Sequence, residues 1–189
     1  RVNIVRAFSD GDFVFAHTEY DFASRRIGFE VFRFEHGFAV EHWDNIQPRK
    51  GPSPSGHSMV DGPTEAEDIA GTELNRNRAS SFIQNILIGR QMGMLNEFFD
   101  SEHLTQHDPH IADGLPAWRA ALEAKSNGKH VMQYKKNHRV LAQGNFVLSV
   151  SEGMFKGVHT SFYDLFRLAN GKILEHWNTL EKVPPGSEW

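Results

Sequence analysis

The sequence predicts an α+β protein with four strands first, then three helices, then four more strands. An internal repeat relates the two sets of strands, which makes two similar sheets the simplest arrangement. Apolar residues spaced three and four apart, as helices require, are concentrated between the two sets. The last two strand-like runs are separated by Asn170-Gly171, a pair that tolerates the positive φ of a tight hairpin turn.

The repeat is clearest around two predicted hairpins. Residues 29–44 match residues 163–178 at a constant shift of 134, and upstream the shift is 133. The matched positions include Phe32-Arg33 with Phe166-Arg167, Gly37 with Gly171, Glu41-His42-Trp43 with Glu175-His176-Trp177, and Gly11 with Gly144. The helical stretch has no counterpart before the first set, so the first copy is a partial repeat that consists of strands alone.

Taken in order, the first copy reads as strands over residues 2–8, 13–20, 28–34 and 38–45, with turns between them. From Pro48 the composition shifts to Pro, Gly, Ser and Lys, which is typical of a loop. We therefore divide the chain into a partial repeat (1–47), a linker (48–70) and a complete unit (71–183).

The complete unit opens with three predicted helices. Thr64 followed by Glu67 has the spacing of a capping box and predicts a helix start there. Residues 72–88 have the periodicity of an amphipathic helix, residues 94–99 form a short second one, and residues 115–125 form a third with Pro116 in its first turn. Four strands follow, over residues 131–142, 145–155, 160–168 and 172–182.

The composition excludes several classes of protein. The 189 residues carry a net charge of −4 and contain no long basic run, which argues against a nucleic-acid or anionic-membrane surface. There are no cysteines, so disulfides and thiolate chemistry are excluded. No apolar stretch approaches the roughly 20 residues of a membrane helix. The first residue is Arg, so the N-terminus is expected to be trimmed or incomplete, and a cytoplasmic location is expected.

At this point the chain resembles a known family, the SnoaL-like polyketide cyclases of the nuclear transport factor 2-like superfamily. The resemblance covers everything except the linker. The segments that carry it are Gln106-His107-Asp108-Pro109, Gly144-Asn145-Phe146-Val147, residues 163–167 and residues 171–178, with residues 11–17 and 40–47 in the first copy. It implies a cone-shaped fold, in which a curved antiparallel sheet wraps around three helices, with the additional four-stranded partial repeat at the N-terminus.

The resemblance also implies a function. Cyclases of this family close a ring by intramolecular aldol condensation in an apolar cavity, which requires an acid and a base but no cofactor. The expected ligand is a small apolar molecule. Many members form homodimers through the outer sheet face. With two sheets in one chain, we expect the sheets to pack against each other within the chain or against a second chain.

Asp164 is the candidate catalytic acid and base, because it stands among bulky apolar residues of a strand, where burial favours proton transfer near neutral pH. A structural alternative is that it faces solvent or pairs with Arg167. The resemblance places His107 at the cavity mouth as a proton shuttle. Glu30, His17 and Trp43 are the corresponding candidates of the partial repeat, although His17 corresponds to Val150 in the complete unit.

Adjacent strand residues point to opposite faces, so only one of His176 and Trp177 can face the cavity. We expect Trp177 to form the pocket wall and His176 to face outward. The other candidate substrate-binding residues are aromatic: Phe82, Phe99, Trp118, Tyr134 and Phe166. Core packing is the alternative role for each of them.

Three further alternatives remain open. Epoxide hydrolysis in the same cone would need a second acid and a residue that holds the water, for which Glu152 and Tyr134 are candidates. His103, His107 and His110 are closely spaced, but Pro109 interrupts any helix that would align them, so no metal site is expected. Finally, the unit could bind a hydrophobic ligand or mediate assembly without catalysis.

Overall fold

The computed structural model describes residues 1–100 and 103–186, and it confirms the predicted α+β composition. The first four strands form one sheet in chain order, and each pairs antiparallel with the next. These strands are β1 (Val2–Asp10), β2 (Phe13–Asp21), β3 (Arg25–Glu35) and β4 (Phe38–Pro48). The first sheet is thus a simple meander, as the turn signals predict.

The remaining elements belong to the second unit. Its helical part consists of η1 (Ile69–Gly71), α1 (Thr72–Phe82), η2 (Ile83–Ile88), η3 (Met92–Phe98) and α2 (Leu115–Glu123). Its strands are β5 (Thr105–Gln106), β6 (Lys125–Ser126), β7 (Lys129–His130), β8 (Met132–Gln143), β9 (Phe146–Phe155), β10 (Val158–Ala169) and β11 (Lys172–Lys182). The second sheet has the order β5-β11-β10-β9-β8, and β5 lies parallel to β11. β5 places Gln106 and His107 beside the middle of β11.

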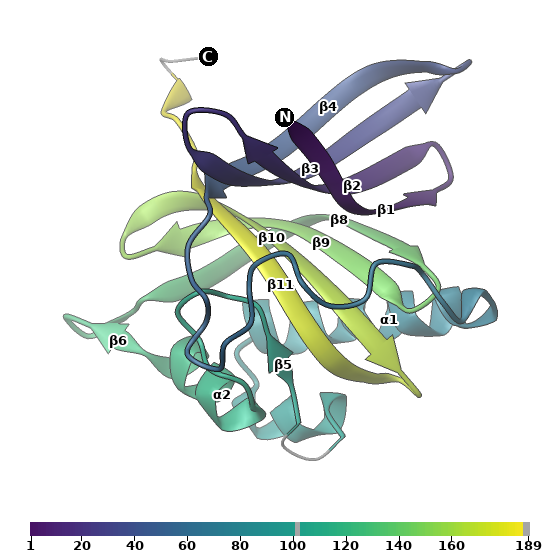
Figure 1. Cartoon of the computed structure of the whole chain (residues 1–189). Coiled ribbons are helices and arrows are strands. Elements are labelled where there is room, and N and C mark those ends of the chain that lie inside the picture. Colours follow the sequence, from purple (N-terminus) through teal and green to yellow (C-terminus); the bar gives the residue numbers. More distant parts are fainter. Residues whose placement is uncertain (101–102, 187–189) are drawn as a thin grey trace.

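The two sheets pack face to face within the chain, as expected, and Figure 1 shows the first sheet lying across the second. Their shared core is large and apolar. It consists of Phe8, Phe15, Ile27, Phe29 and Val31 from the first sheet, Leu141, Phe146, Leu148, Tyr163, Leu165 and Trp177 from the second, and Met59 from the linker. Because so many large apolar side chains are buried between the sheets, this contact is a hydrophobic core that stabilises their packing.

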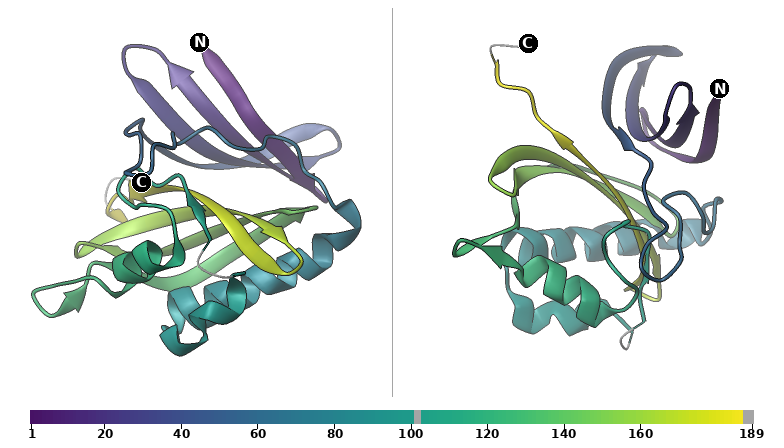
Figure 2. Two further views of the ribbon diagram at one scale, coloured as in Figure 1. Left: turned by 60° about the horizontal axis from the view of Figure 1, so that its bottom comes forward. Right: turned by 60° about the vertical axis from the view of Figure 1, so that its left-hand side comes forward.

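The helices cover the opposite face of the second sheet (Figure 2). A second buried cluster fills this layer, with Phe82, Ile86 and Trp118 from the helices against Phe162 and Phe166 of β10. The second sheet therefore buries both of its faces. Its strands are apolar on both sides, so sequence alternation alone does not tell which face a given side chain occupies.

One prediction for the linker, the helix start at Thr64, is wrong. Residues 64–68 are not helical, and the helical run begins only at Ile69. The Glu67 carbonyl instead accepts from the Asn145 N–H, and the Glu67 N–H donates to the side-chain Oδ1 of Asn145. Because these bonds to the β8–β9 turn use the backbone groups that a helix would need, the capping box does not form.

The predicted helices are otherwise present with shifted ends. The helix of residues 72–88 is α1 continued by one π-helical segment, η2, and the short second helix is the 3₁₀ element η3. The third helix, α2, ends at Glu123, two residues before the predicted end.

Gly153 of β9 is required by the close approach of β8. A Cβ built on Gly153 would lie 1.8 Å from the Gln133 carbonyl oxygen, so Gly153→Ala must displace backbone. We expect this variant to lower the free energy of unfolding by about 2 kcal/mol or more. Gly93→Ala is the control, because a Cβ there meets nothing within 4 Å. Urea titrations that give equal midpoints for the two variants would contradict the expectation.

Candidate active site

Asp164 lies in the middle of β10 and is fully buried, with 0% of its surface exposed. It shares the helix-facing side of the sheet with Phe162 and Phe166. Both of its carboxyl oxygens have partners. The Tyr134 hydroxyl donates to Oδ2 at 2.9 Å, and His176 Nε2 lies 2.8 Å from Oδ1. The acid is therefore neither exposed nor paired with Arg167.

The hydrogen bonds around His176 determine where its protons lie. The Asp108 N–H donates to Gln106 Oε1 at 3.0 Å, which fixes the orientation of the Gln106 amide. The same oxygen lies 2.9 Å from His176 Nδ1, so Nδ1 must donate to it. One proton then remains for the bond between His176 Nε2 and Asp164 Oδ1. It rests on the imidazole in one state of the pair and on the carboxyl group in the other.

Aromatic rings enclose this pair. Trp118 stacks on His176 with ring centroids 4.4 Å apart, and Phe166 stacks on it at 5.3 Å. Phe82 contacts the rings of both Trp118 and Phe166. The structure thus gathers the five predicted aromatic candidates of the helical layer and the sheet in one buried cluster: Phe82, Phe99, Trp118, Tyr134 and Phe166. In such apolar surroundings, each hydrogen bond of the Asp164 carboxyl group is electrostatically stronger than it would be in water.

Tyr134 acts here as a hydrogen-bond donor. Burial raises its pKa well above the usual value of 10.0, and the neighbouring charges of Asp164 and Asp108 and the hydrogen bond to Asp164 add to this shift. The phenol therefore keeps its proton at neutral pH. It presents an O–H group to Asp164 or to any oxygen that replaces it.

Two buried polar atoms beside the pair have no partner among the residues that the structure describes. They are Gln106 Nε2, a donor, and Asn178 Oδ1, an acceptor. Asn178 lies directly opposite Asp164 in the strand pair, and its Nδ2 donates to Asp108 Oδ2 at 2.8 Å. Buried groups of this kind are costly unless something binds them, so they are atoms that a ligand with its own donor and acceptor could satisfy.

The expectation for His176 and Trp177 is wrong, because the two are exchanged. His176 faces the helices, and Trp177 lies between the sheets, where its Nε1 donates to the Asp61 carbonyl at 2.9 Å. The cause is a bulge at Leu174. A regular hairpin around Asn170-Gly171 would place Trp177 opposite Asp164, but the register shift places Asn178 there and turns every following side chain to the other face.

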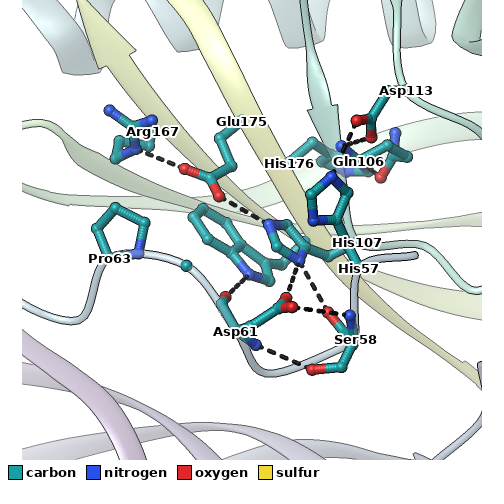
Figure 3. Close-up of polar contacts among 12 residues, drawn as sticks. His57, Ser58, Asp61, Pro63, Gln106, His107, Asp113, Arg167, Glu175 and His176 are labelled. Carbon is teal, nitrogen blue, oxygen red and sulfur yellow. Dashed lines mark hydrogen bonds and ion pairs between the residues drawn. The ribbon is translucent and has the colours of Figure 1, made fainter. Parts of the chain in front are cut away.

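The structure also does not bring His107 to Asp164. His107 stacks on Trp177 at 4.6 Å and lies under the linker, as Figure 3 shows. Its Nε2 is 2.7 Å from Glu175 Oε1, and its Nδ1 is 2.8 Å from the Ser58 carbonyl and 2.7 Å from Asp61 Oδ1. With acceptors at both nitrogens, His107 joins the linker to β11.

Glu175 is the centre of this second polar cluster. Burial alone would raise its pKa, but the hydrogen bonds from His107 and Arg167 hold the pKa below the ordinary value of 4.5. Arg167 Nε donates to Glu175 Oε2 at 2.6 Å. Arg6 reaches in from the first sheet and donates to the linker carbonyls of Val60 and Asp61, at 3.0 and 2.9 Å. We call Arg6, Asp61, His107, Arg167 and Glu175 the linker clamp.

The partial-repeat candidates lie apart from both clusters or at their edge. His17 is buried between the sheets, 2.6 Å from Arg6 Nη1 through its Nδ1. Burial, Arg6 and His107 together hold the pKa of His17 well below 6.5, so it is neutral. Trp43 is partly exposed at the end of the shared core, and Arg139 stacks on its ring. Glu30 lies on the face of the first sheet that points away from the second.

Sequence reasoning identified Asp164 but missed its partner His176 and the orienting residue Gln106. The segment Gln106-His107-Asp108 was recognised in the sequence, but only His107 was considered as a functional residue, and the amide side chain of Gln106 was overlooked. Among residues 1–100 and 103–186, no group of three or more His, Asp or Glu side chains is arranged to hold a metal ion. No helix in the same described part of the chain is long and apolar enough to cross a membrane.

Comparison with solved structures establishes the fold. A proposed ketosteroid isomerase from Kribbella flavida DSM 17836 superposes with a TM-score of 0.50 at 14% identity, covering 62% of this chain and 87% of the other. An NTF-2 like protein of unknown function from Burkholderia xenovorans LB400 gives 0.46 at 15% identity, over 62% and 93% of the two chains. An LEH-like epoxide hydrolase from M. tuberculosis gives 0.44 at 14% identity, over 58% and 84%.

No family model matches the sequence, and no curated protein does. The superposition on the Kribbella flavida protein therefore carries the assignment, and at 14% identity it establishes the fold alone. The chain has the α+β fold of nuclear transport factor 2-like proteins over about 62% of its length, and a separate four-stranded antiparallel sheet precedes this part.

Proposed function

We propose that this protein is an acid–base enzyme of the SnoaL-like cyclase kind, which acts on a small apolar carbonyl compound without a cofactor. One observation supports the proposal: the carboxyl group of Asp164 is fully buried inside an aromatic enclosure and lies 2.8 Å from the Nε2 atom of His176, at hydrogen-bond distance. Such a pair can take up and return a proton without contact with water, as enolate chemistry requires.

In the proposed reaction, Asp164 in its carboxylate state removes a proton from the carbon next to a substrate carbonyl. The proton is then held on Asp164 Oδ2, which the Tyr134 O–H leaves in order to donate to the enolate oxygen, while the proton of the Asp164–His176 bond stays on His176. For ring closure, the enolate carbon attacks a second carbonyl of the same molecule, one carbon–carbon bond forms, and the proton held by the pair neutralises the resulting alkoxide. His176 holds Asp164 in position and stabilises its carboxylate through the Nε2–Oδ1 hydrogen bond.

A binding function without turnover is the second candidate, and one observation favours it. Both oxygens of Asp164 are already occupied, and the pair is closed to solvent. If these bonds persist when a ligand is present, the network is a structural element of a hydrophobic binding site.

The two candidates differ in whether protons exchange. Tetralone, a small aromatic ketone, can be incubated with the protein in D₂O while the loss of its α-proton signal is followed by NMR. The enzyme hypothesis predicts exchange above the buffer rate together with saturation by the ketone. Binding that shifts the Trp118 and His176 resonances without faster exchange would establish the second candidate instead.

Replacement of Tyr134 by Phe tests the role of the phenol. We expect exchange to slow by roughly 100-fold, the lower end of the cost of losing an oxyanion donor, because Asp164 keeps its hydrogen bond with His176. The effect should fall on kcat more than on KM. A variant with unchanged kcat would show that Tyr134 only supports Asp164 in the resting state.

A further inference from the structure

Gln106 sets the proton arrangement of the Asp164–His176 pair, because its Oε1 is the acceptor for His176 Nδ1. With that acceptor in place, Nδ1 keeps its proton, and a second proton lies in the bond between Nε2 and Asp164 Oδ1. Without the acceptor, a neutral imidazole would keep its one proton on Nε2, directed at the Asp164 carboxylate. The state of the pair therefore depends on where the Gln106 amide lies.

Few contacts hold the Gln106 amide itself. Its Oε1 also accepts from the Asp108 N–H at 3.0 Å, and its Nε2 has no partner among the residues that the structure describes. The side chain therefore follows the backbone of β5, which is two residues long and pairs with β11 through Thr105 and Gln106. Because so short an edge strand has few backbone hydrogen bonds, contacts from outside the sheet decide its local stability.

The linker supplies two such contacts, and the first holds the side chain of His107. Its Nδ1 lies 2.8 Å from the Ser58 carbonyl oxygen and 2.7 Å from Asp61 Oδ1. Its Nε2 lies 2.7 Å from Glu175 Oε1, so the ring is bound by the linker on one side and by β11 on the other (Figure 3). Because His107 directly follows Gln106, this contact holds the end of β5 against β11.

The second contact reaches the backbone of Gln106. Asp113 Oδ1 accepts from the Gln106 N–H at 2.9 Å, and Asp113 Oδ2 lies 2.9 Å from Nε2 of the linker residue His57. The Asp113 N–H also donates to Ser55 Oγ at 2.8 Å. Asp113 thus joins two residues of the linker to the residue that orients His176.

The linker is fixed in turn by the first sheet. Arg6 of β1 is 4% exposed. It donates to the linker carbonyls of Val60, Asp61 and Pro63 at 3.0, 2.9 and 3.0 Å. Its guanidinium lies over the Trp177 ring, 4.6 Å from the centroid. Hydrogen bonds from a charged donor are stronger than neutral ones, so Arg6 anchors the linker to the first sheet.

We propose that the linker is a positioning element for the Asp164–His176 pair, on which it acts by holding Gln106 of β5 at the Nδ1 atom of His176. This role rests on the proposed function, because it concerns the same proton transfer. The first sheet carries no part of the pair, but it anchors the segment that orients it. His107 and Asp113 are then positioning residues, which act through Gln106 without touching a substrate.

The Nδ1–H proton of His176 reports the proposed contact directly. It is buried and hydrogen-bonded, so it should give a low-field imidazole N–H signal in NMR spectra of the full chain labelled with ¹⁵N-histidine. Asp113→Ala removes the acceptor of the Gln106 N–H and should speed the exchange of this proton with solvent at least about tenfold. Asp61→Ala, at a half-exposed linker carboxylate, should act in the same direction and replaces the first variant if that one does not fold.

Asp10→Ala is the matched control. Asp10 also joins the first sheet to the second unit, because it accepts from Arg76 and from the Ala142 N–H, each at 3.1 Å. Like Asp113, it is a partly exposed carboxylate that binds both a basic side chain and a backbone N–H. Its loss should lower stability but leave the exchange rate of the His176 Nδ1–H within about twofold of the rate in the unmodified protein.

Two results would overturn the proposal. Unchanged exchange of the imidazole proton in folded Asp113→Ala and Asp61→Ala would show that the linker only stabilises the fold. Equal acceleration in Asp10→Ala would assign the effect to a general loosening of the contact between the two units.

This measurement needs no substrate, so its result is independent of the proposed function. If the unmodified protein exchanges the α-protons of tetralone, Asp113→Ala should lower kcat at least about tenfold with little change in KM, because the acid–base pair is misplaced. A rise in KM alone would contradict the positioning role. If the unmodified protein exchanges no protons, the proposed function fails, and the imidazole signal still decides whether the linker orients His176.

Discussion

Replacement of Asp164 by Asn is expected to lower the rate of α-proton exchange by at least about 1,000-fold. Asparagine has nearly the same shape and can still accept the hydrogen bond from Tyr134, so the aromatic enclosure should stay closed. It cannot take up or release the proton that Asp164 shares with His176. The exchange assay with tetralone in D₂O measures this loss directly.

The control for this variant is Glu65→Gln, which neutralises an exposed carboxyl group of the linker. It should exchange protons at the rate of the unmodified protein. If Asp164→Asn were folded, as judged by its amide spectrum, and still exchanged at the normal rate, Asp164 would not be the base. If it bound tetralone but no variant or parent protein exchanged protons, the site would be a binding site only.

Replacement of Glu175 by Ala is expected to lower the free energy of unfolding by about 3 kcal/mol or more. The carboxylate accepts from both His107 and Arg167, and its own side chain is only 4% exposed. Removing it leaves two donors without an acceptor beneath the linker. The linker should then loosen, which hydrogen exchange at Ser58 and Asp61 would report.

The repeat supplies a matched control for this prediction. Glu41 pairs with Arg33 at 2.7 Å, in the same register as Glu175 with Arg167, but the Glu41 side chain is 44% exposed. Glu41→Ala should therefore change stability little, since exposed ion pairs contribute little. Urea unfolding of both variants gives the comparison, and equal losses would show that the linker clamp is not responsible.

The same clamp predicts a pH dependence. Because the pKa of Glu175 is lower in the folded protein than its ordinary 4.5, the clamp contributes stability above that pH and loses it as the pH falls through the folded pKa. The free energy of unfolding should thus fall in this acid range. The Glu175→Gln variant should lack this part of the decrease, and parallel curves would assign the acid sensitivity to other carboxyl groups.

Much of the fold was predictable from the chain. The repeat and the Asn170-Gly171 turn are local signals, and the eight predicted strands end within three residues of the observed ends. The false helix start at Thr64 shows the limit of local reasoning. The backbone of Glu67 bonds to Asn145, which is far along the sequence, and no local pattern reports such a contact.

The candidate site was only partly predictable for a related reason. Asp164 could be identified because it lies inside a run of bulky apolar residues. Burial of a carboxyl group there costs free energy unless the group is hydrogen-bonded, which suggests a functional role. Its partner depends on the bulge at Leu174, which exchanges the faces of His176 and Trp177. The second sheet is apolar on both sides, so neither residue type nor alternation could reveal that exchange. His107 was misplaced because its contacts come from the linker, whose path the sequence does not specify.

The apolar contact between the sheets has a consequence for synthesis of the chain on the ribosome. Strands β1 to β4 pair only with their neighbours, so they can assemble as soon as they emerge. Their partners Phe146, Leu148 and Trp177 follow about 100 to 130 residues after the end of β4, a delay of roughly 5–25 s at typical elongation rates. During that interval Phe15, Phe29 and Val31 face water in the nascent chain, which makes this stage the one at which chaperones or premature aggregation would act.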